Sequence, residues 1–312
     1  MVLAYRTEIA LPAHRTSGGF DHAAVHRASA RLYVAHTAND ALDVIDCATD
    51  RYLHSIPNLT GVAGALVSDE HNLVLTSNRG EHTVGIFAPE TEADLVKVAV
   101  GIGPNGLAYD PGRELLLAAN VGDPEQPGSQ TVSLVDVGKR ALVATVAVPG
   151  RTRWTVFDSH QEVFFVNIAD PPQIVVIDAR HPTQLARVYE VPAAGPHGLD
   201  LDGAHGRLYC ACDAGRLVCL EAHSGRVLDE RELSGVPDVM FLNARLEHLY
   251  VAVGDPGVID VFDSRALEPL ETVTTERGAH TIAFDGDRNK VYALLPQTHR
   301  AAVYVDTGVP RV

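Results

Sequence analysis

A repeat of roughly 42 residues runs along nearly the whole chain, and it constrains the fold more than any other feature of the sequence. Each copy places one distinctive residue just before a short apolar run, as in Gly195-Pro196-His197-Gly198-Leu199. The equivalent residues, separated by 42, 41, 49, 43, 41 and 42 positions, are His22, Gly64, Asn105, Trp154, His197, Asp238 and His280. A period near this length, with several short strands in each copy, is typical of β-propeller blades. The sequence therefore predicts an all-β, seven-bladed β-propeller.

The seven copies account for residues 1–312 as a single propeller domain with four-stranded blades. The blades are expected to start near residues 19, 61, 101, 150, 194, 235 and 277. The last copy offers only three strands, whereas residues 3–11 form an isolated strand that ends at Pro12. We expect this N-terminal strand to complete blade 7, because closing the ring removes exposed sheet edges.

The charge and the apolar content of the chain exclude several classes of partner. The formal net charge of −15 is opposite to the basic stripe that nucleic-acid binding needs, so no nucleic-acid partner is expected. No apolar run is long enough to span a bilayer, so we expect no membrane contact. Residues 1–8 lack the charged and then apolar pattern of a secretory signal, which predicts a cytoplasmic protein.

Known catalytic and phosphate-binding motifs are also missing from the sequence. It contains no Gly-x-Ser-x-Gly elbow of the kind that presents a nucleophilic serine, and no Walker loop. One Gly-x-Gly-x-x-Gly string, at Gly101, Gly103 and Gly106, precedes a predicted strand instead of a helix and therefore indicates a turn.

The four cysteines, Cys47, Cys210, Cys212 and Cys219, lack the Cys-x-x-Cys spacing of a zinc site. Cys210 and Cys219 flank a turn predicted at residues 213–216. If Cys212 pairs with Leu217 across this hairpin, Cys210 stands opposite Cys219, either as a buried dithiol or as a cross-strand disulfide. A reducing compartment favours the free thiols.

The residue before the first strand of each blade is expected to point into the mouth of the central channel. His197, Asp238, His280 and His22 then come from the consecutive blades 5, 6, 7 and 1 and lie on one arc. Imidazole and carboxylate ligands suit a divalent metal, with Zn²⁺, Mn²⁺, Fe²⁺, Ni²⁺ and Mg²⁺ as candidates, and an open coordination position would activate water. The alternative is a hydrated polar channel without a metal.

Further candidates follow from the same geometry. His280 and His36 are the predicted acid–base groups, His36 because it lies fourteen residues beyond His22, where the second strand returns to the same face. The predicted substrate-binding residues are Asn105, Trp154, Asn78 and His82. Blade 3 carries extra residues at 122–130, which are either a lid over the channel or a tolerated surface insertion.

Two families share short motifs with this chain. The units Leu32-Tyr33-Val34-Ala35 and Leu249-Tyr250-Val251-Ala252, with a trailing Val-Ile-Asp, resemble the repeat of the Tyr-Val-Thr-Asn (YVTN) seven-bladed propellers. The segments Pro196-His197-Gly198-Leu199 and Ala279-His280-Thr281-Ile282 resemble streptogramin B lyase, another seven-bladed propeller. That resemblance implies that His280 acts as a base. The position of the family's metal-binding glutamate, fourteen residues further on, is Leu294 here.

Two functions are therefore expected. The first is a metal-dependent lyase or lactone hydrolase that acts on a small molecule at the channel mouth. The second is a non-catalytic propeller that binds a protein or a small ligand.

Overall fold

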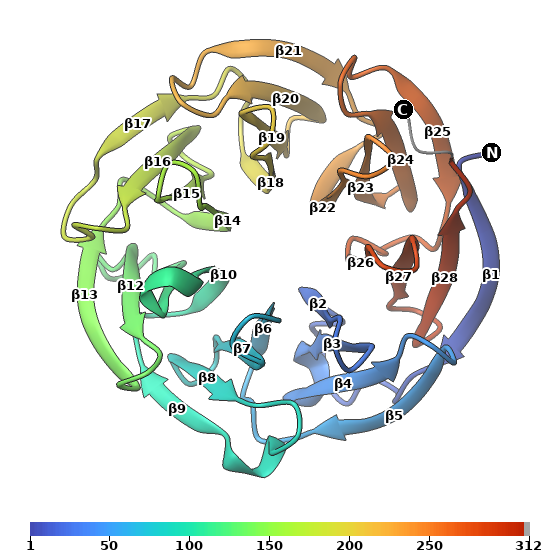
Figure 1. Cartoon of the computed structure of the whole chain (residues 1–312), viewed down its shortest axis with the longest axis horizontal. Helices are drawn as coiled ribbons and strands as arrows, with labels where there is room; N and C mark the ends of the chain where they lie inside the picture. The colour runs from blue at the N-terminus through green and yellow to red at the C-terminus, as the bar shows by residue number, and fades with distance from the viewer. Residues whose placement is uncertain (309–312) are drawn as a thin grey trace.

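The computed structural model describes residues 1–308, which form a closed ring of seven four-stranded antiparallel sheets around a central axis (Figure 1). The only helical elements in this range are three short 3-10 turns, η1 (Thr37–Asn39), η2 (Glu92–Asp94) and η3 (Pro111–Arg113). No helix in the described part of the chain is long and apolar enough to cross a membrane. The prediction of an all-β, seven-bladed propeller is confirmed.

The strands follow one another from the centre of the ring to its rim in each blade. Blades 1 to 3 consist of β2 (Ala23–His26), β3 (Arg31–His36), β4 (Ala41–Asp46), β5 (Arg51–Ile56); β6 (Val62–Ser68), β7 (Leu73–Asn78), β8 (Thr83–Phe87), β9 (Val96–Ala99); and β10 (Pro104–Asp110), β11 (Leu115–Asn120), β12 (Thr131–Asp136), β13 (Ala141–Ala147).

Blades 4 to 6 repeat this order, and blade 7 ends on the N-terminal strand. These blades consist of β14 (Thr152–Asp158), β15 (Val163–Ile168), β16 (Gln173–Asp178), β17 (Arg187–Glu190); β18 (Pro196–Asp202), β19 (Arg207–Cys212), β20 (Arg216–Glu221), β21 (Val227–Glu232); β22 (Val236–Asn243), β23 (His248–Asp255), β24 (Val258–Asp263), β25 (Pro269–Thr274); and β26 (Ile282–Asp285), β27 (Lys290–Leu295), β28 (Arg300–Asp306), β1 (Leu3–Ala10).

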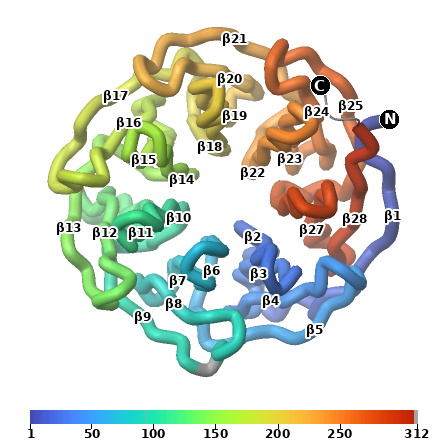
Figure 2. Tube along the Cα trace, in the orientation of Figure 1, coloured from blue at the N-terminus to red at the C-terminus, as the bar shows by residue number. Residues whose placement is uncertain are grey.

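The ring is closed by β1, which pairs antiparallel with β28 from Leu3 opposite Asp306 to Ala10 opposite Arg300. The strand therefore supplies the outer edge of blade 7, as predicted, and it places the start of β1 beside the end of β28 (Figure 2). After β1, the backbone N–H of Leu11 donates to the carbonyl of His299 at 2.9 Å, which ties the following segment to blade 7 as well.

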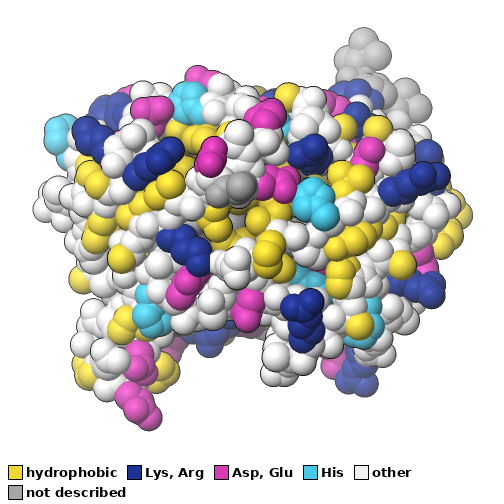
Figure 3. Space-filling view, turned by 90° about the horizontal axis from the view of Figure 1, so that it is seen from below, with side chains coloured by type: hydrophobic (Ala, Val, Ile, Leu, Met, Phe, Trp, Pro, Cys, Tyr) yellow, Lys and Arg dark blue, Asp and Glu magenta, His cyan; other side chains and the backbone are white. Residues whose placement is uncertain are grey.

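The core lies between the blades. Middle strands such as β15 and β24 are buried along their whole length, because both of their faces pack against neighbouring sheets, and their residues are almost continuously apolar. Outer strands such as β25 alternate between half-buried and exposed residues, as expected for a strand with one face in solvent. On the outer wall, charged side chains of both signs are interspersed among hydrophobic ones (Figure 3).

The cysteine hairpin differs from the prediction by one residue. Cys212 pairs with Arg216, so Cys210 stands opposite Val218 and Tyr209 opposite Cys219. The loop is one residue shorter than expected, because Gly215 adopts a φ of 71° and closes a three-residue turn. The predicted Cys210–Cys219 pair is therefore wrong, and all four cysteines are free and buried.

Candidate ligand site at the channel mouth

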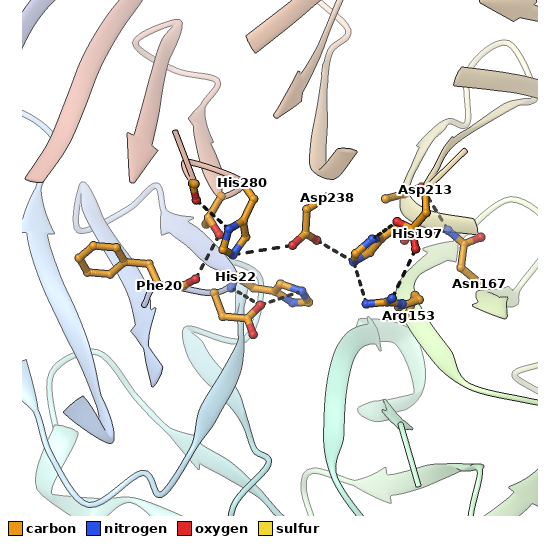
Figure 4. Close-up of polar contacts among 12 residues, drawn as sticks. Phe20, His22, Arg153, Asn167, His197, Asp213, Asp238 and His280 are labelled. Atoms are coloured by element: carbon orange, nitrogen blue, oxygen red, sulfur yellow. Dashed lines mark hydrogen bonds and ion pairs between the residues drawn. The ribbon is translucent and has the colours of Figure 1, made fainter. Parts of the chain in front are cut away.

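A bulge at the mouth explains why the repeated residue points away from its own sheet. In five blades the register of the first strand shifts at this position, between Val62 and Gly64, Pro104 and Leu107, Thr152 and Thr155, Pro196 and Gly198, and Pro237 and Met240. A bulge leaves one residue unpaired and re-aims its side chain. The side chains at the equivalent positions in blades 5 and 6, His197 and Asp238, are released in this way and lie near one another (Figure 4).

Glycine beside the bulge lets neighbouring blades approach closely. A Cβ at Gly198 would collide with the carbonyl oxygen of Asp238 in the next blade. Gly106 has the same relation to the carbonyl oxygen of Arg153. The Pro-His-Gly sequence therefore combines a side chain for the mouth with the small residue that the packing of blades 5 and 6 requires.

His197 is held by carboxylates on both ring nitrogens. Its Nδ1 lies 2.7 Å from Asp213 Oδ1, and its Nε2 lies 3.0 Å from Asp238 Oδ1. Burial lowers the pKa of His197, but the two carboxylates outweigh burial and raise the pKa to about 9. Burial would raise the pKa of Asp238, yet His197, His280 and His22 hold it well below its usual range. His197 is therefore a doubly protonated imidazolium paired with Asp238 at neutral pH.

Three arginines, which the sequence analysis missed, surround this pair. Arg153 Nη1 lies 3.2 Å from His197 Nε2, and Arg153 Nη2 lies 3.5 Å from Asp213 Oδ2. The Asp213 carboxylate therefore contacts both Arg153 and His197. On the other side, Arg79 Nη2 lies 3.2 Å from Asp21 Oδ2.

The third arginine, Arg151, has no side-chain hydrogen bond or ion pair within residues 1–308. Burial lowers its pKa, and so do the positive charges of Arg153 and Arg79. The signal that could have revealed these residues is the Arg-Thr-Arg sequence directly before Trp154, because alternate residues of a strand point to the same side.

His280 lies on the far side of Asp238. Its Nδ1–H donates to the carbonyl of Gly278 at 2.8 Å, so in the neutral ring Nε2 carries the lone pair. This nitrogen is 3.9 Å from Asp238 Oδ2. Together with His197, Asp238 and Arg277, His280 lines a cavity of about 360 Å³ over blades 5 to 7.

The fourth predicted ligand, His22, turns toward a different carboxylate. Its Nε2 lies 3.3 Å from Asp21 Oδ1, and its ring packs on Trp154 with centroids 4.0 Å apart. Burial is the main cause that lowers the pKa of His22. Because His22 and Trp154 belong to blades 1 and 4, their contact crosses the channel and closes it beneath the mouth.

A second cavity, of about 520 Å³, lies beyond this contact. Its walls come from the first strands of the blades and are mostly apolar, with Leu66, Val156 and Phe241 among the lining residues. Three acidic residues, Asp69, Glu70 and Asp200, also line it, and the Asp200 carboxylate is bonded to the backbone. The backbone N–H groups of Leu201 and Leu242 donate to that carboxylate at 2.8 and 2.7 Å, while burial raises its pKa to about 6.

The predicted metal ligands form separate pairs in this structure. His197 bonds to Asp213 and Asp238, His22 faces Asp21, and His280 approaches Asp238 alone. Among residues 1–308, no group of three or more His, Cys, Asp or Glu side chains is arranged so that it could hold a metal ion. The metal at His22, His197, Asp238 and His280 thus stays a prediction.

The remaining predicted site residues do not join this arrangement. His36 is fully buried and bonds to Asp43 at 2.7 Å. Asn78 is buried within blade 2, where its amide donates to Thr83 Oγ1 at 2.9 Å. His82 is exposed and accepts a hydrogen bond from the N–H of Gly103 at 3.1 Å. Asn105 occupies the equivalent bulge of blade 3, and its buried Oδ1 has no partner in the described part of the chain.

Comparisons with known proteins establish the fold alone. No protein-family model and no curated protein matches the sequence. Among solved structures, a chain of the Kuenenia stuttgartiensis hydrazine synthase superposes with a TM-score of 0.81 at 12% identity, over 96% of this chain and 97% of that one. A chain of a mitotic checkpoint complex superposes with a TM-score of 0.81 at 11% identity, over 99% and 92%. Both are similar to this chain as β-propellers, and at such identities the similarity does not extend to function.

Proposed function

We propose that the protein is a ligand-binding propeller whose channel mouth recognises a small molecule with an anionic group, such as a carboxylate. The observation that carries this proposal is the charge at the mouth. Arg79, Arg151, Arg153 and protonated His197 face three carboxylates, those of Asp21, Asp213 and Asp238. The mouth is thus positive by one charge, although the whole chain carries −15.

Arg151 is the residue that we expect to bind the anionic group. Burial and the charges of Arg153 and Arg79 lower the pKa of its guanidinium, whereas the Asp213 carboxylate, which already contacts Arg153 and His197, opposes them. No ion pair or side-chain hydrogen bond holds Arg151 within residues 1–308. An anionic group between these guanidinium groups would relieve their repulsion and form charge-assisted hydrogen bonds. The adjoining cavity of about 360 Å³ is within the usual size range of small-ligand pockets.

A screen of thermal stability tests this proposal. Small carboxylic acids would be compared with their neutral amides, because a ligand that binds only the folded state raises the melting temperature. We expect the acids to stabilise the wild type and to have no effect on Arg151→Ala. Arg226→Ala removes an equal charge from an exposed position on blade 5 and is the matched control. Equal stabilisation by the acid and its amide would refute an anion site.

One observation favours a second function. The Gly278 carbonyl accepts from His280 Nδ1–H and leaves the lone pair on Nε2, as a general base requires, and His280 lines the cavity. This favours a lyase or lactone hydrolase as the second candidate function. The divalent metal predicted at the mouth is part of this second proposal, and so is membership of the YVTN-repeat propellers, which the sequence resembles. The test is turnover of small lactones with and without added divalent ions, in wild type and His280→Ala. Turnover that persists in His280→Ala would exclude His280 as the base.

A further inference from the structure

Three histidines meet at the seam where the ring closes. Residues 11–22 connect β1 of blade 7 to β2 of blade 1, and we call this segment the strap. The backbone N–H of Leu11 donates to His299 O at 2.9 Å, and that of Arg15 donates to Asn39 Oδ1 at 2.8 Å. His14 lies between these two anchors, so the strap carries it into the space between blades 7 and 1.

The ring of His14 packs directly against the other two. The centroid of His14 lies 4.3 Å from that of His299, in the turn between β27 and β28, and 5.0 Å from that of His36, at the end of β3. Phe20 covers the same group, with its ring 4.9 Å from His14 and 4.5 Å from His36. The cluster is thus shielded by an aromatic ring and assembled from three separate segments.

Each of these histidines has one buried nitrogen without a partner. These nitrogens are His14 Nε2, His36 Nε2 and His299 Nδ1, and none of them has a hydrogen-bond partner within residues 1–308. Buried polar atoms are nearly always hydrogen-bonded in native proteins. Three such atoms on adjacent rings therefore indicate a missing common partner.

The surroundings of His36 identify what kind of partner fits. The ring is fully buried, and its Nδ1–H donates to Asp43 Oδ2 at 2.7 Å. Ser55 Oγ in turn donates to Asp43 Oδ1 at 2.5 Å. With the proton on Nδ1, the unpartnered Nε2 is the nitrogen that offers a lone pair in the neutral ring. In metal sites, a histidine usually binds the metal through one ring nitrogen and donates a hydrogen bond to a carboxylate through the other, which fixes the orientation of the ring.

We propose that His14, His36 and His299 bind one divalent transition metal ion, such as Zn²⁺, and that this ion fastens the strap to blades 1 and 7. Imidazole nitrogens bind zinc at about 2.0–2.1 Å, so two rings on one tetrahedral ion have centroids about 5 Å apart. The observed spacings of 5.0 and 4.3 Å are close to this value.

The site is not already in coordination geometry, because no group of three ligands in the described chain meets that condition. Binding must turn the rings of His14 and His299, which are only half-buried and lie on the strap and on a turn. His36 stays in place through its bond to Asp43. The ion would therefore join two half-buried histidines, one on the strap and one on a turn, to the buried His36, and it would stabilise the closure of the ring.

The test uses tag-free full-length protein with Co²⁺ and Zn²⁺ as probes. We expect one equivalent of Co²⁺ to give the visible absorption of a tetrahedral site, and Zn²⁺ to displace it and to raise the melting temperature. His14→Ala and His299→Ala, at half-buried positions, should each weaken binding at least about tenfold without preventing folding. His181→Ala, at an exposed position, should bind like wild type and is the matched control. His280→Ala shows whether a metal is bound at the channel mouth instead.

Two results would overturn the proposal. One is the absence of Co²⁺ or Zn²⁺ binding by folded wild-type protein. The other is binding that survives in both His14→Ala and His299→Ala. Binding that is lost only in His280→Ala would also refute the seam site, and it would instead assign the metal to the channel mouth. The first two outcomes leave the anion site proposed above unaffected, because that site does not involve the seam histidines.

Discussion

His22 and Trp154, from blades 1 and 4 on opposite sides of the ring, pack across the central channel with their ring centroids 4.0 Å apart and their planes tilted by 50°. This contact divides the axis of the propeller into two compartments. On one side is the charged mouth with Arg153, His197 and Asp238, and on the other is the mostly apolar cavity of about 520 Å³. The charged mouth and the mostly apolar cavity are thus separated by the His22–Trp154 contact.

The contact can be followed by fluorescence, because Trp154 is the only tryptophan in the chain. A protonated imidazole quenches indole emission, so the emission should fall as His22 gains a proton. Burial lowers the pKa of His22 from its ordinary value of 6.5, and the midpoint of this transition should therefore lie below pH 6.5. His22→Gln should abolish it. A midpoint above pH 6.5, or an unchanged transition in His22→Gln, would contradict the packing described.

Because of His197, the free energy of unfolding should decrease as the pH rises into the alkaline range. Its pKa is about 9 in the folded protein and about 6.5 in the unfolded chain, so the stabilisation is complete below pH 6.5 and is lost as the pH rises through 9. The free energy of unfolding should fall by up to about 3 kcal/mol over this interval. Urea denaturation at several pH values would measure it. His197→Gln should lack this component, and equal slopes in both proteins would rule out the ion pair as its source.

Closure by β1 predicts a large effect of one buried side chain near the N-terminus. Ile9 is buried against blades 7 and 1, so Ile9→Ala should lower the free energy of unfolding by about 2–4 kcal/mol. Tyr5, on the same strand, is 60% exposed, and Tyr5→Ala should cost less than about 1 kcal/mol. Similar losses in the two variants would show that β1 does not contribute a packed strand.

The thiols should be unreactive in the folded protein. All four cysteines are free and buried, and burial raises the pKa of Cys47 to about 12 and that of Cys219 to about 11. A thiol reagent should therefore label none of them rapidly in the native state and four after unfolding without a reductant. Fewer than four in the unfolded chain would reveal a disulfide.

The fold could be predicted from the sequence because every blade needs buried strands and tight turns at the same positions. A strand buried on both faces must be apolar, and the tight turns require Asp, Asn or Gly, so the period of the repeat is visible in the residue types. The position of His197 and Asp238 at the mouth followed from this period. The bulges of blades 5 and 6 preserve it, since they fall on His197 and Asp238.

The pairing of the charged side chains could not be predicted in the same way. Asp213, which holds both His197 and Arg153, is a turn residue after β19, and nothing in the repeat distinguishes it from other turn aspartates. His14 lies in the strap, outside every copy of the repeat, so its contact with His36 and His299 depends on how the ring closes. The direction of a side chain depends on tertiary contacts, which a periodic pattern does not contain.

The central claim is that the channel mouth binds anions, and calorimetric titration tests it most directly. The most stabilising acid from the thermal screen would be titrated into wild type, Arg151→Ala and Arg226→Ala at low and at moderate ionic strength. We expect one site in the wild type, affinity that falls as salt screens the charges, at least about tenfold weaker binding to Arg151→Ala, and no change in Arg226→Ala. Binding of equal strength to wild type and Arg151→Ala, independent of salt, would contradict the claim.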